Sequence, residues 1–221
     1  MPAKTRVKIK NSRLCQSCQT PSVLNNIIYL AIKNLAVFLA RVFFGPRVEG
    51  RENIPSKSPF IVAANHTSFL DPVVVQAALP MKIRWIAKKA VYEHPFLKFI
   101  NYVSGTIPMN GAVEKALSAL EGEDVLGIFP EGGRSPDGRL REANSGVAVL
   151  ALRSGGKVVP VGIKGAYEAF PASRKIFKPY PVVVRIGMPF SFRRINEEVI
   201  DERIIKETKD LVMERIKELL R

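Results

Sequence analysis

The sequence predicts an α/β protein in which helices flank a mostly parallel central sheet, preceded by an apolar helical segment. Beyond Pro46, short apolar runs alternate with helix-like segments, which is the pattern of strand–helix–strand units. The chain has 221 residues, of which 47% are hydrophobic, enough for one domain with a sizeable core. We therefore divide it into a basic leader with a membrane-interfacial helix (residues 1–46) and a single α/β domain (residues 47–221).

Each strand is predicted from a short apolar run bounded by turn residues, and each helix from a longer segment with one apolar face. The predicted strands cover residues 60–64, 83–87, 125–129, 158–163 and 181–186. The predicted helices follow Pro72 and cover about 114–120 and 145–153. The tail from 197 to 220 carries apolar residues, Ile204 among them, between many charges, which indicates a surface helix packed by one face.

The segment 23–44 is strongly apolar, but Lys33, Asn34 and Arg41 interrupt it. A spanning helix needs about 20 residues with few or no charges, whereas long cationic side chains reach head groups from a helix in the membrane interface. The pattern therefore favours an interfacial helix over a spanning one. A buried core helix is the alternative. A cleavable signal peptide is not expected, because no small-residue cleavage site follows the apolar run.

The charge of the chain is strongly positive. There are 34 Lys and Arg against 20 Asp and Glu, and half of the net charge of +14 lies within residues 1–53. Such a distribution implies a polyanionic partner, either an anionic membrane surface or nucleic acid. Nucleic acid is not expected, since neither a recognised motif nor an interleaving of aromatic with basic residues supports it.

The two cysteines, Cys15 and Cys18, form one CxxC in the basic leader. There is no second CxxC and no nearby histidine to complete a zinc site. We interpret the pair as incidental and expect no metal.

His66 is one of only two histidines in the chain, and Asp71 follows it five positions later. His66 ends a predicted strand, and Asp71 precedes Pro72 at a helix start, where an aspartate is the natural N-cap. Each residue alone thus has a structural explanation. Together they lie at a strand-to-helix turn, where α/β proteins place ligand sites. A carboxylate that accepts from one ring nitrogen leaves the other free to take a proton from a hydroxyl, so the pair predicts hydroxyl activation.

A second polar group follows the predicted strand 125–129. Its residues are Glu131, Gly132, Gly133, Arg134 and Ser135. The glycines let the backbone approach a ligand closely, and the arginine offers a fork suited to phosphate. A glycine-rich surface loop with a solvated charge pair is the structural alternative. It does not explain why a Glu and an Arg flank the glycines at the same sheet edge as His66.

These two groups resemble the motifs of the glycerolipid acyltransferase family. The stretch 65–71 (NHTSFLD) is similar to the family's HxxxxD motif, and 129–135 (FPEGGRS) is similar to its EGxRS motif. Further similar segments occur in the family's order at 48–55, 87–108 and 159–162. The resemblance runs from about Val48 to Gly187 and is greatest to the bacterial 1-acylglycerol-3-phosphate acyltransferases.

The resemblance implies transfer of a fatty acyl group to the sn-2 hydroxyl of 1-acylglycerol-3-phosphate, giving phosphatidic acid in phospholipid synthesis. The donor would be a thioester of acyl carrier protein or coenzyme A, with no other cofactor. His66 would be the general base, Asp71 would orient it, and no covalent acyl-enzyme would form. The acceptor would be bound by Glu131, Gly132, Arg134 and Ser135. The enzyme would be a peripheral or monotopic protein at the cytoplasmic face of the cell membrane.

Two cations that the resemblance leads one to expect are missing. Asn110 stands where Arg is usual, and Asn144 stands where Lys is frequent. If the acceptor carries a phosphate, Arg134 needs help from nearby cations, because an unpaired dianion in a partly dry cleft is costly. The candidate cations are Lys88, Arg139 and Arg141. The alternatives are a different lysolipid acceptor, or a catalytically weak lipid-binding protein with the same fold.

Overall fold

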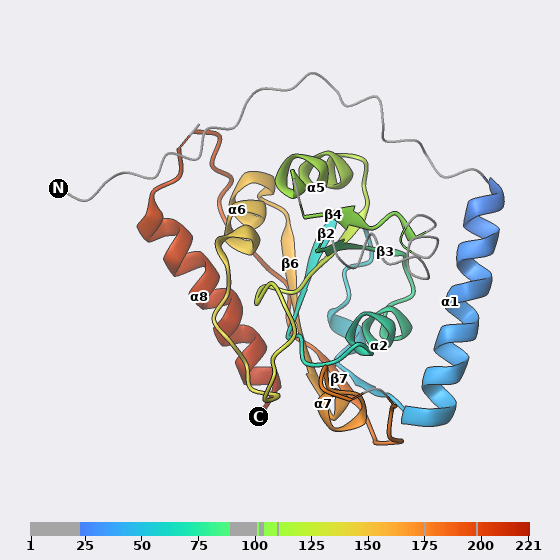
Figure 1. Cartoon of the computed structure of the whole chain (residues 1–221). Coiled ribbons are helices and arrows are strands. Elements are labelled where there is room, and N and C mark those ends of the chain that lie inside the picture. Colours follow the sequence, from blue (N-terminus) through green and yellow to red (C-terminus); the bar gives the residue numbers. More distant parts are fainter. Residues whose placement is uncertain (1–22, 89–100, 102–103, 110, 175, 198) are drawn as a thin grey trace.

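The computed structural model describes residues 23–88, 101, 104–109, 111–174, 176–197 and 199–221 (Figure 1). The predictions on the leader, on Cys15 and Cys18 and on Asn110 lie outside these residues. The described elements, in chain order, are α1 (Val23–Phe44), β1 (Arg47–Glu49), a 3-10 turn (Arg51–Asn53), β2 (Phe60–Ala64), α2 (Asp71–Ala78), β3 (Ile83–Ala87), β4 (Ile107–Pro108), α5 (Ala112–Glu121), β5 (Val125–Ile128), α6 (Ser145–Ser154), β6 (Lys157–Lys164), α7 (Ala166–Ala169), β7 (Val183–Ile186), β8 (Phe190–Ser191) and α8 (Glu202–Leu219).

The strands form one sheet in the order β1-β7-β6-β2-β5-β3-β4, and β8 also pairs with β6. The pairs β2–β5, β2–β6, β3–β5, β3–β4 and β1–β7 are parallel. Strands β7 and β8 run antiparallel to β6. The prediction of a mostly parallel sheet is confirmed. The carboxyl ends of β2 and β5 therefore lie side by side, and the two predicted polar groups follow these two ends.

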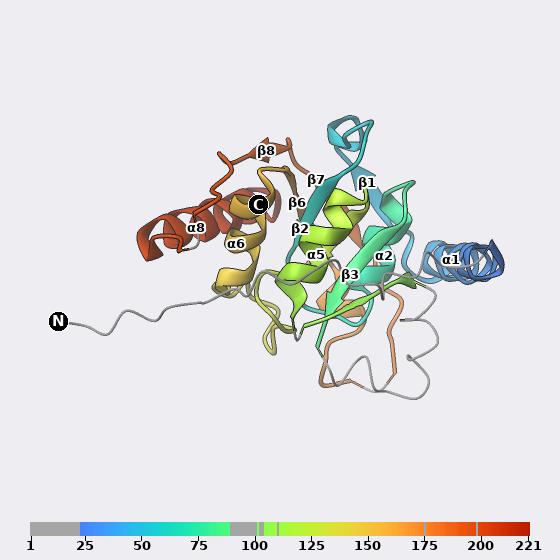
Figure 2. The same ribbon diagram turned by 90° about the horizontal axis from the view of Figure 1, so that it is seen from above.

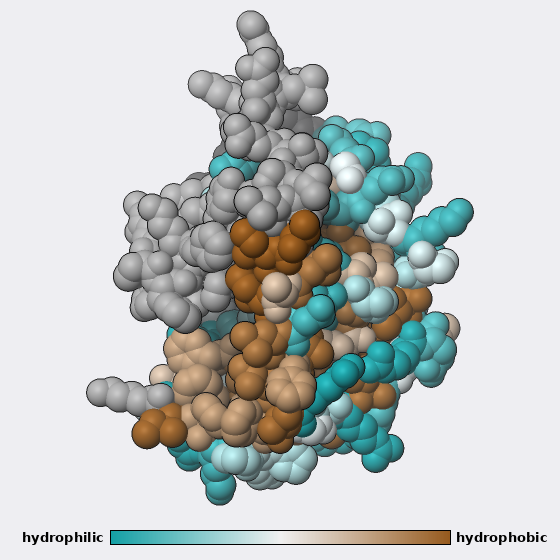
Figure 3. All heavy atoms as spheres, turned by 90° about the vertical axis from the view of Figure 1, so that its right-hand side faces the viewer, coloured by the Kyte–Doolittle hydropathy of each residue, from teal (hydrophilic) through white to brown (hydrophobic). Residues whose placement is uncertain are grey.

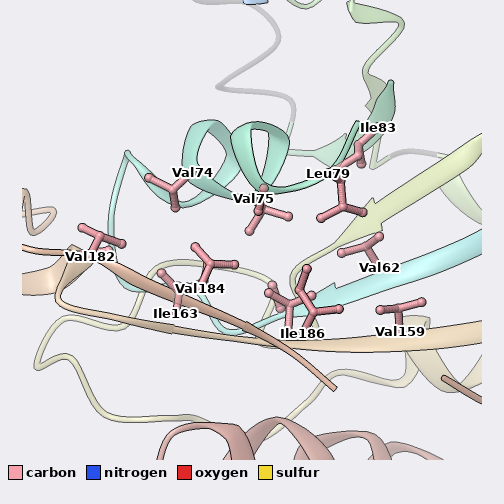
Figure 4. Packing of buried hydrophobic residues seen from close by; sticks show 14 of the residues in the cluster. Val62, Val74, Val75, Leu79, Ile83, Val159, Ile163, Val182, Val184 and Ile186 are labelled. Atoms are coloured by element: carbon pink, nitrogen blue, oxygen red, sulfur yellow. The ribbon is translucent and has the colours of Figure 1, made fainter. Parts of the chain in front are cut away.

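Helices cover both faces of the sheet: α2 and α1 lie on one side, and α6 and α8 lie on the other (Figures 1 and 2). Strand β2 is buried on both faces of the sheet, which explains why its sequence is apolar throughout. Phe60, Val62 and Ala64 belong to the core beneath α2, while Ile61 and Ala63 belong to the core beneath α5, α6 and α8. In the first of these cores, the valines of α2 point toward the side chains of β7 (Figure 4).

Helix α1 covers the predicted segment 23–44. Its buried side packs on α2: Ala40 and Phe44 belong to the core, and the Tyr29 hydroxyl donates to Gln76 Oε1 at 2.8 Å. Only 17% of the apolar window Ile27–Phe44 is buried, so α1 is not a core helix. Its exposed side is apolar and appears as the brown surface in Figure 3. Its exposed large apolar residues are Ile27, Leu30, Leu35, Phe38, Leu39, Val42 and Phe43.

The remaining differences from the predicted elements lie at element ends, in short strands and in the four-residue helix α7, which was not predicted. Helix α8 begins at Glu202 rather than near residue 197, because Asp201 caps it by accepting from the backbone N–H of Arg203 at 2.7 Å. Ile204, expected on its packed face, is exposed. Strands β1, β4 and β8 were not predicted, because two or three residues are too few to show a periodic pattern.

Candidate active site

A buried amide fixes the point at which the chain leaves the sheet. Asn65 directly follows β2, and its side chain donates to the Ile163 carbonyl at 3.0 Å and accepts from the Ile163 N–H at 2.7 Å. This pair of bonds continues the pairing of β2 with β6 beyond the last strand residue. Sequence reasoning gave Asn65 no separate role, although an asparagine directly after a buried apolar strand is a signal of such a contact.

His66 and Asp71 lie in direct contact, as their spacing predicts. His66 Nδ1 lies 2.8 Å from Asp71 Oδ2, and the carboxylate is fully buried. The same oxygen accepts from the backbone N–H groups of Thr67 at 2.6 Å and Ser68 at 2.7 Å. An ionised carboxylate only accepts, so Nδ1 carries the ring proton and Nε2 is the basic nitrogen. The His66 side chain retains 16% exposure, which leaves this nitrogen accessible.

The predicted N-cap role of Asp71 is wrong. Helix α2 begins at Asp71 itself, its cap residue is Leu70, and no side chain caps it. The carboxylate instead turns back toward the preceding loop. Two backbone N–H groups and the imidazole converge on it there, and this is more favourable than a single bond to the helix.

Glu131 connects the polar group that follows β5 to the one that follows β2. Its Oε1 accepts from the backbone N–H of His66 at 2.7 Å, and its Oε2 accepts from that of Arg141 at 3.0 Å. The Ser135 N–H donates to the carbonyl of His66 at 2.7 Å, so the backbone of His66 is held on both sides. Glu131 is buried, which raises its pKa to about 7 although both backbone bonds oppose the shift. The carboxylate therefore bonds to backbone groups and does not face the cavity described below.

Arg134 lies across the ring of Phe69, with the guanidinium carbon 3.5 Å from the ring centroid. Its Nη1 is buried and has no hydrogen-bond partner within the part of the chain that the structure describes. Burial lowers the pKa of Arg134, and the charge of Asp71 opposes this shift. A cation with an unused buried donor favours an anion beside it.

Lys88 lies beside the same glycine loop. A Cβ atom added to Gly133 would come within 3.0 Å of Lys88 Nζ. Gly132 has φ +67°, a conformation that favours glycine, and a Cβ there would meet Asn144 Nδ2 at 2.1 Å and displace that side chain. Asn144 in turn donates to the Glu131 carbonyl at 3.3 Å and precedes α6.

The other predicted residues of this loop take structural positions. Ser135 is fully buried, and its hydroxyl donates to Asp137 Oδ1 at 2.8 Å. The Arg139 side chain is 88% exposed and pairs with Asp137 at 3.9 Å, and Arg141 is also exposed. Neither arginine lines the cavity described next. Of the three candidate cations, Lys88 lines the same cavity as Arg134. Arg139 and Arg141 lie outside that cavity.

His66, Lys88 and Arg134 share a cavity of about 630 Å³. Sites that hold small ligands typically have about 300–1,000 Å³. Most of the wall is apolar and comes from elements on both faces of the sheet. Its apolar residues include Ile32, Ile83, Trp85, Val113, Ile128, Val147 and Leu150. The cavity thus combines a base, three cations (Lys33, Lys88 and Arg134) and a largely apolar wall.

The imidazole of the base is stacked on two further rings, those of Phe129 and Trp85. The centroids of His66 and Phe129 lie 3.9 Å apart with planes 14° apart, and those of Phe129 and Trp85 lie 4.6 Å apart with planes 8° apart. A Cβ at Gly127 would come within 2.5 Å of the Trp85 ring, so this strand glycine makes room for the stack. Sequence reasoning missed Trp85 and Phe129. The available signals were the single tryptophan and the glycine inside an apolar strand.

Within the described residues, no three His, Cys, Asp or Glu side chains gather in a way that could hold a metal ion.

The chain belongs to the Acyltransferase family, whose model matches residues 45–164, a range that includes both polar groups. The predicted family is thereby confirmed. The structure is similar to that of the 1-acyl-sn-glycerophosphate acyltransferase of Thermotoga maritima, with a TM-score of 0.73 and 27% identity. The similarity covers 88% of this chain and 80% of that one, which confirms the predicted fold class.

Curated relatives carry the name 1-acyl-sn-glycerol-3-phosphate acyltransferase. That of Bacillus subtilis is 28% identical over 183 residues, covering 79% of this chain and 88% of the relative. That of Borreliella burgdorferi is 32% identical over 131 residues, covering 56% and 52%. The chloroplastic one of Arabidopsis thaliana is 28% identical over 138 residues, covering 58% and 38%. The chain thus matches about half or less of the length of the last two relatives.

Proposed function

We propose that this chain is an O-acyltransferase that moves a fatty acyl group from an acyl thioester to the sn-2 hydroxyl of 1-acylglycerol-3-phosphate, giving phosphatidic acid. One observation carries the proposal: an imidazole, hydrogen-bonded to a fully buried carboxylate, opens into a largely apolar cavity beside an arginine with an unused donor. The names of the relatives support the choice of acceptor.

In the proposed reaction, His66 Nε2 takes the proton of the acceptor hydroxyl while the hydroxyl oxygen attacks the carbonyl carbon of the thioester. The new C–O bond forms, the C–S bond breaks, and the imidazolium returns its proton to the leaving thiolate. Asp71 stabilises the imidazolium through Nδ1–H and fixes the ring. General base catalysis of this kind contributes about 10²–10⁴ in rate. No covalent acyl-enzyme and no cofactor besides the thioester of acyl carrier protein or coenzyme A is required.

The acceptor's phosphate would lie between Arg134 and Lys88, the cations of the cavity that lie at the glycine loop. Two other polar side chains of the loop are engaged within the protein, since Ser135 bonds to Asp137 and Glu131 bonds to two backbone N–H groups. The apolar wall would receive an acyl chain, because burying each methylene contributes about 0.8 kcal/mol. The acceptor and the donor would then meet at His66.

Membrane attachment through the exposed side of α1 is part of the proposal. Bulky apolar side chains gather on this side, and Arg41 borders it, as in helices that lie in the interface. The helix also contributes Tyr29, Ile32 and Ala36 to the wall of the cavity. A lipid acceptor would therefore pass from the bilayer to the base alongside α1. The positive chain would act at an anionic cytoplasmic surface, where acidic acyl carrier protein is available as donor.

The test is an assay of the purified protein in detergent with a labelled acyl thioester and a panel of lysolipid acceptors. We expect labelled phosphatidic acid from the wild-type protein and none above background from His66→Ala. Wild-type turnover by a folded His66→Ala protein would refute the assignment of the base. Absence of transfer to every acceptor by the wild-type protein would instead support a lipid-binding protein.

A further inference from the structure

A second groove borders α1, separate from the cavity that contains His66. Lys33, Val37 and Gln76 border both spaces, but Asn34 and Arg41 line only the second. Its other walls are the connection between β1 and β2 and the end of α2 with the turn that follows it. The volume is about 630 Å³. The groove therefore lies where α1 meets the rest of the domain.

Among the residues that the structure describes, three cations and no Asp or Glu line this groove. They are Lys33, Arg41 and Arg51. Lys33 Nζ donates to the Pro80 carbonyl at 3.0 Å, which leaves two of its three donors. The side chains of Arg41 and Arg51 are exposed and form no ion pair within the described residues. Three cations without a carboxylate repel one another, and an anion between them removes this repulsion.

Most other residues of the wall are apolar, among them Val37, Ile54, Ala77, Leu79 and Met81. A free inorganic anion would leave these surfaces unused. A phosphate with an attached glycerol and acyl chains would use both, because its head group meets the cations and its apolar part meets the wall. The groove also adjoins the exposed apolar side of α1, which includes Phe38 and Val42.

We propose that this groove binds the head group of an anionic phospholipid, at a site distinct from that of the acceptor. The bound phosphate would connect α1 to the β1–β2 connection through Arg41 and Arg51. Since α1 also forms part of the wall beside His66, such a lipid would hold that wall in place. Binding at this site requires neither His66 nor turnover, so it can be tested independently of the proposed acyl transfer.

The test is calorimetric titration of the full chain with dihexanoyl-phosphatidylglycerol below its micellar concentration. This soluble lipid has one negative charge and no phosphate monoester. We expect Arg41→Gln/Arg51→Gln to weaken binding about tenfold, the effect of losing charge-assisted hydrogen bonds. The matched control is Arg47→Gln, which removes a charge from a side chain that is 77% exposed, lies near the groove and does not line it. Its affinity should change less than about twofold.

Further arms locate the site and identify its ligand. Zwitterionic dihexanoyl-phosphatidylcholine and inorganic phosphate should both bind at least about tenfold more weakly than the anionic lipid. Equal binding of phosphatidylcholine, or an equal loss in Arg47→Gln, would overturn the site. Phosphate binding as tight as the lipid's would overturn the lipid assignment. An equal loss in Arg134→Ala would place the lipid in the His66 cavity and also overturn it. Arg51→Gln alone serves if the double variant does not fold.

Discussion

The Glu131 carboxylate accepts the backbone N–H of His66 at 2.7 Å, so an acid from the second polar group holds the backbone of the base in the first. Its other oxygen holds Arg141, and no part of it lines the cavity. The contacts favour a positioning role over direct binding of the acceptor. They also place an ionisable group inside the framework of the site, where its protonation changes stability.

Replacing Glu131 with Gln should remove part of the pH dependence of stability. Burial raises the pKa of Glu131 from 4.5 to about 7. Between these values the folded protein keeps a proton that the unfolded chain releases, so the contribution of this group to the free energy of unfolding falls as pH rises. The fall levels off about one pH unit above 7 and amounts to about 3 kcal/mol. Urea unfolding in mild detergent at pH 5, 6, 7 and 8 measures it.

The control for that experiment is the difference between the two proteins rather than either curve alone, since other groups titrate in the same range. We expect the free energy of unfolding of wild type, less that of Glu131→Gln, to fall between pH 5 and pH 7 and to level off by pH 8. Parallel curves across the whole range would contradict a raised pKa for this carboxyl.

His66→Ala should reduce kcat by about two to four orders of magnitude, because an unassisted hydroxyl is a poor nucleophile. Asp71→Asn should also be severe, although its amide oxygen can still accept from Thr67 and Ser68. The variant loses the charge that stabilises the imidazolium and buries an amide N–H₂ where Asp71 Oδ1 has no described partner. The second effect costs about 1–3 kcal/mol of stability. Thermal melting beside the assay separates the two, and wild-type kcat in folded Asp71→Asn would contradict the mechanism.

Arg134→Ala should raise KM for 1-acylglycerol-3-phosphate by about tenfold or more and leave KM for the thioester nearly unchanged. Arg139→Ala is the matched control, because its exposed guanidinium lies outside the cavity. Lys88→Ala should act in the same direction as Arg134→Ala.

The acceptor itself is tested by kcat/KM for the phosphate-terminated lysolipid beside a zwitterionic one. A clear preference for the zwitterionic acceptor would refute the proposed head group and leave the acyl-transfer chemistry standing.

Phe38→Asp/Val42→Asp should weaken flotation of the protein with anionic liposomes by at least about tenfold. Both side chains are 61% exposed, and burying an apolar side chain of this size contributes about 1.5–3 kcal/mol. Met188→Asp is the control, since Met188 is 75% exposed and lies outside α1. Deleting α1 would be a poorer test because Ala40 and Phe44 belong to the core. Equal flotation of the wild type, the double variant and Met188→Asp would show that the exposed side of α1 does not attach the protein to the membrane.

The parts of the fold that could be predicted are those set by local pattern. Strand β2 has the predicted bounds because five consecutive apolar residues are buried on both faces of the sheet. The contact of His66 with Asp71 could be expected because a five-residue turn keeps their side chains within reach. The antiparallel course of β7 could not, since its direction depends on the long connection after α7 rather than on its own residues.

The partners of the second polar group depended on contacts between segments far apart in the chain. Glu131 and Arg134 are three residues apart, yet one bonds to backbone beneath the site and the other faces the cavity. Their composition alone does not distinguish these positions. Lys88 reaches the loop because β3 lies next to β5, which only the order of the strands reveals.

Trp85 is the only tryptophan in the chain, and it lies one ring away from the imidazole of the base. Fluorescence excited selectively in indole therefore reports from the wall of the cavity and from nowhere else in the protein. A lipid entering beside Phe129 would displace water from that wall and change the polarity around the indole. The native chain thus carries its own optical probe of site occupancy, and titrations of donor, acceptor and product can be followed without a label.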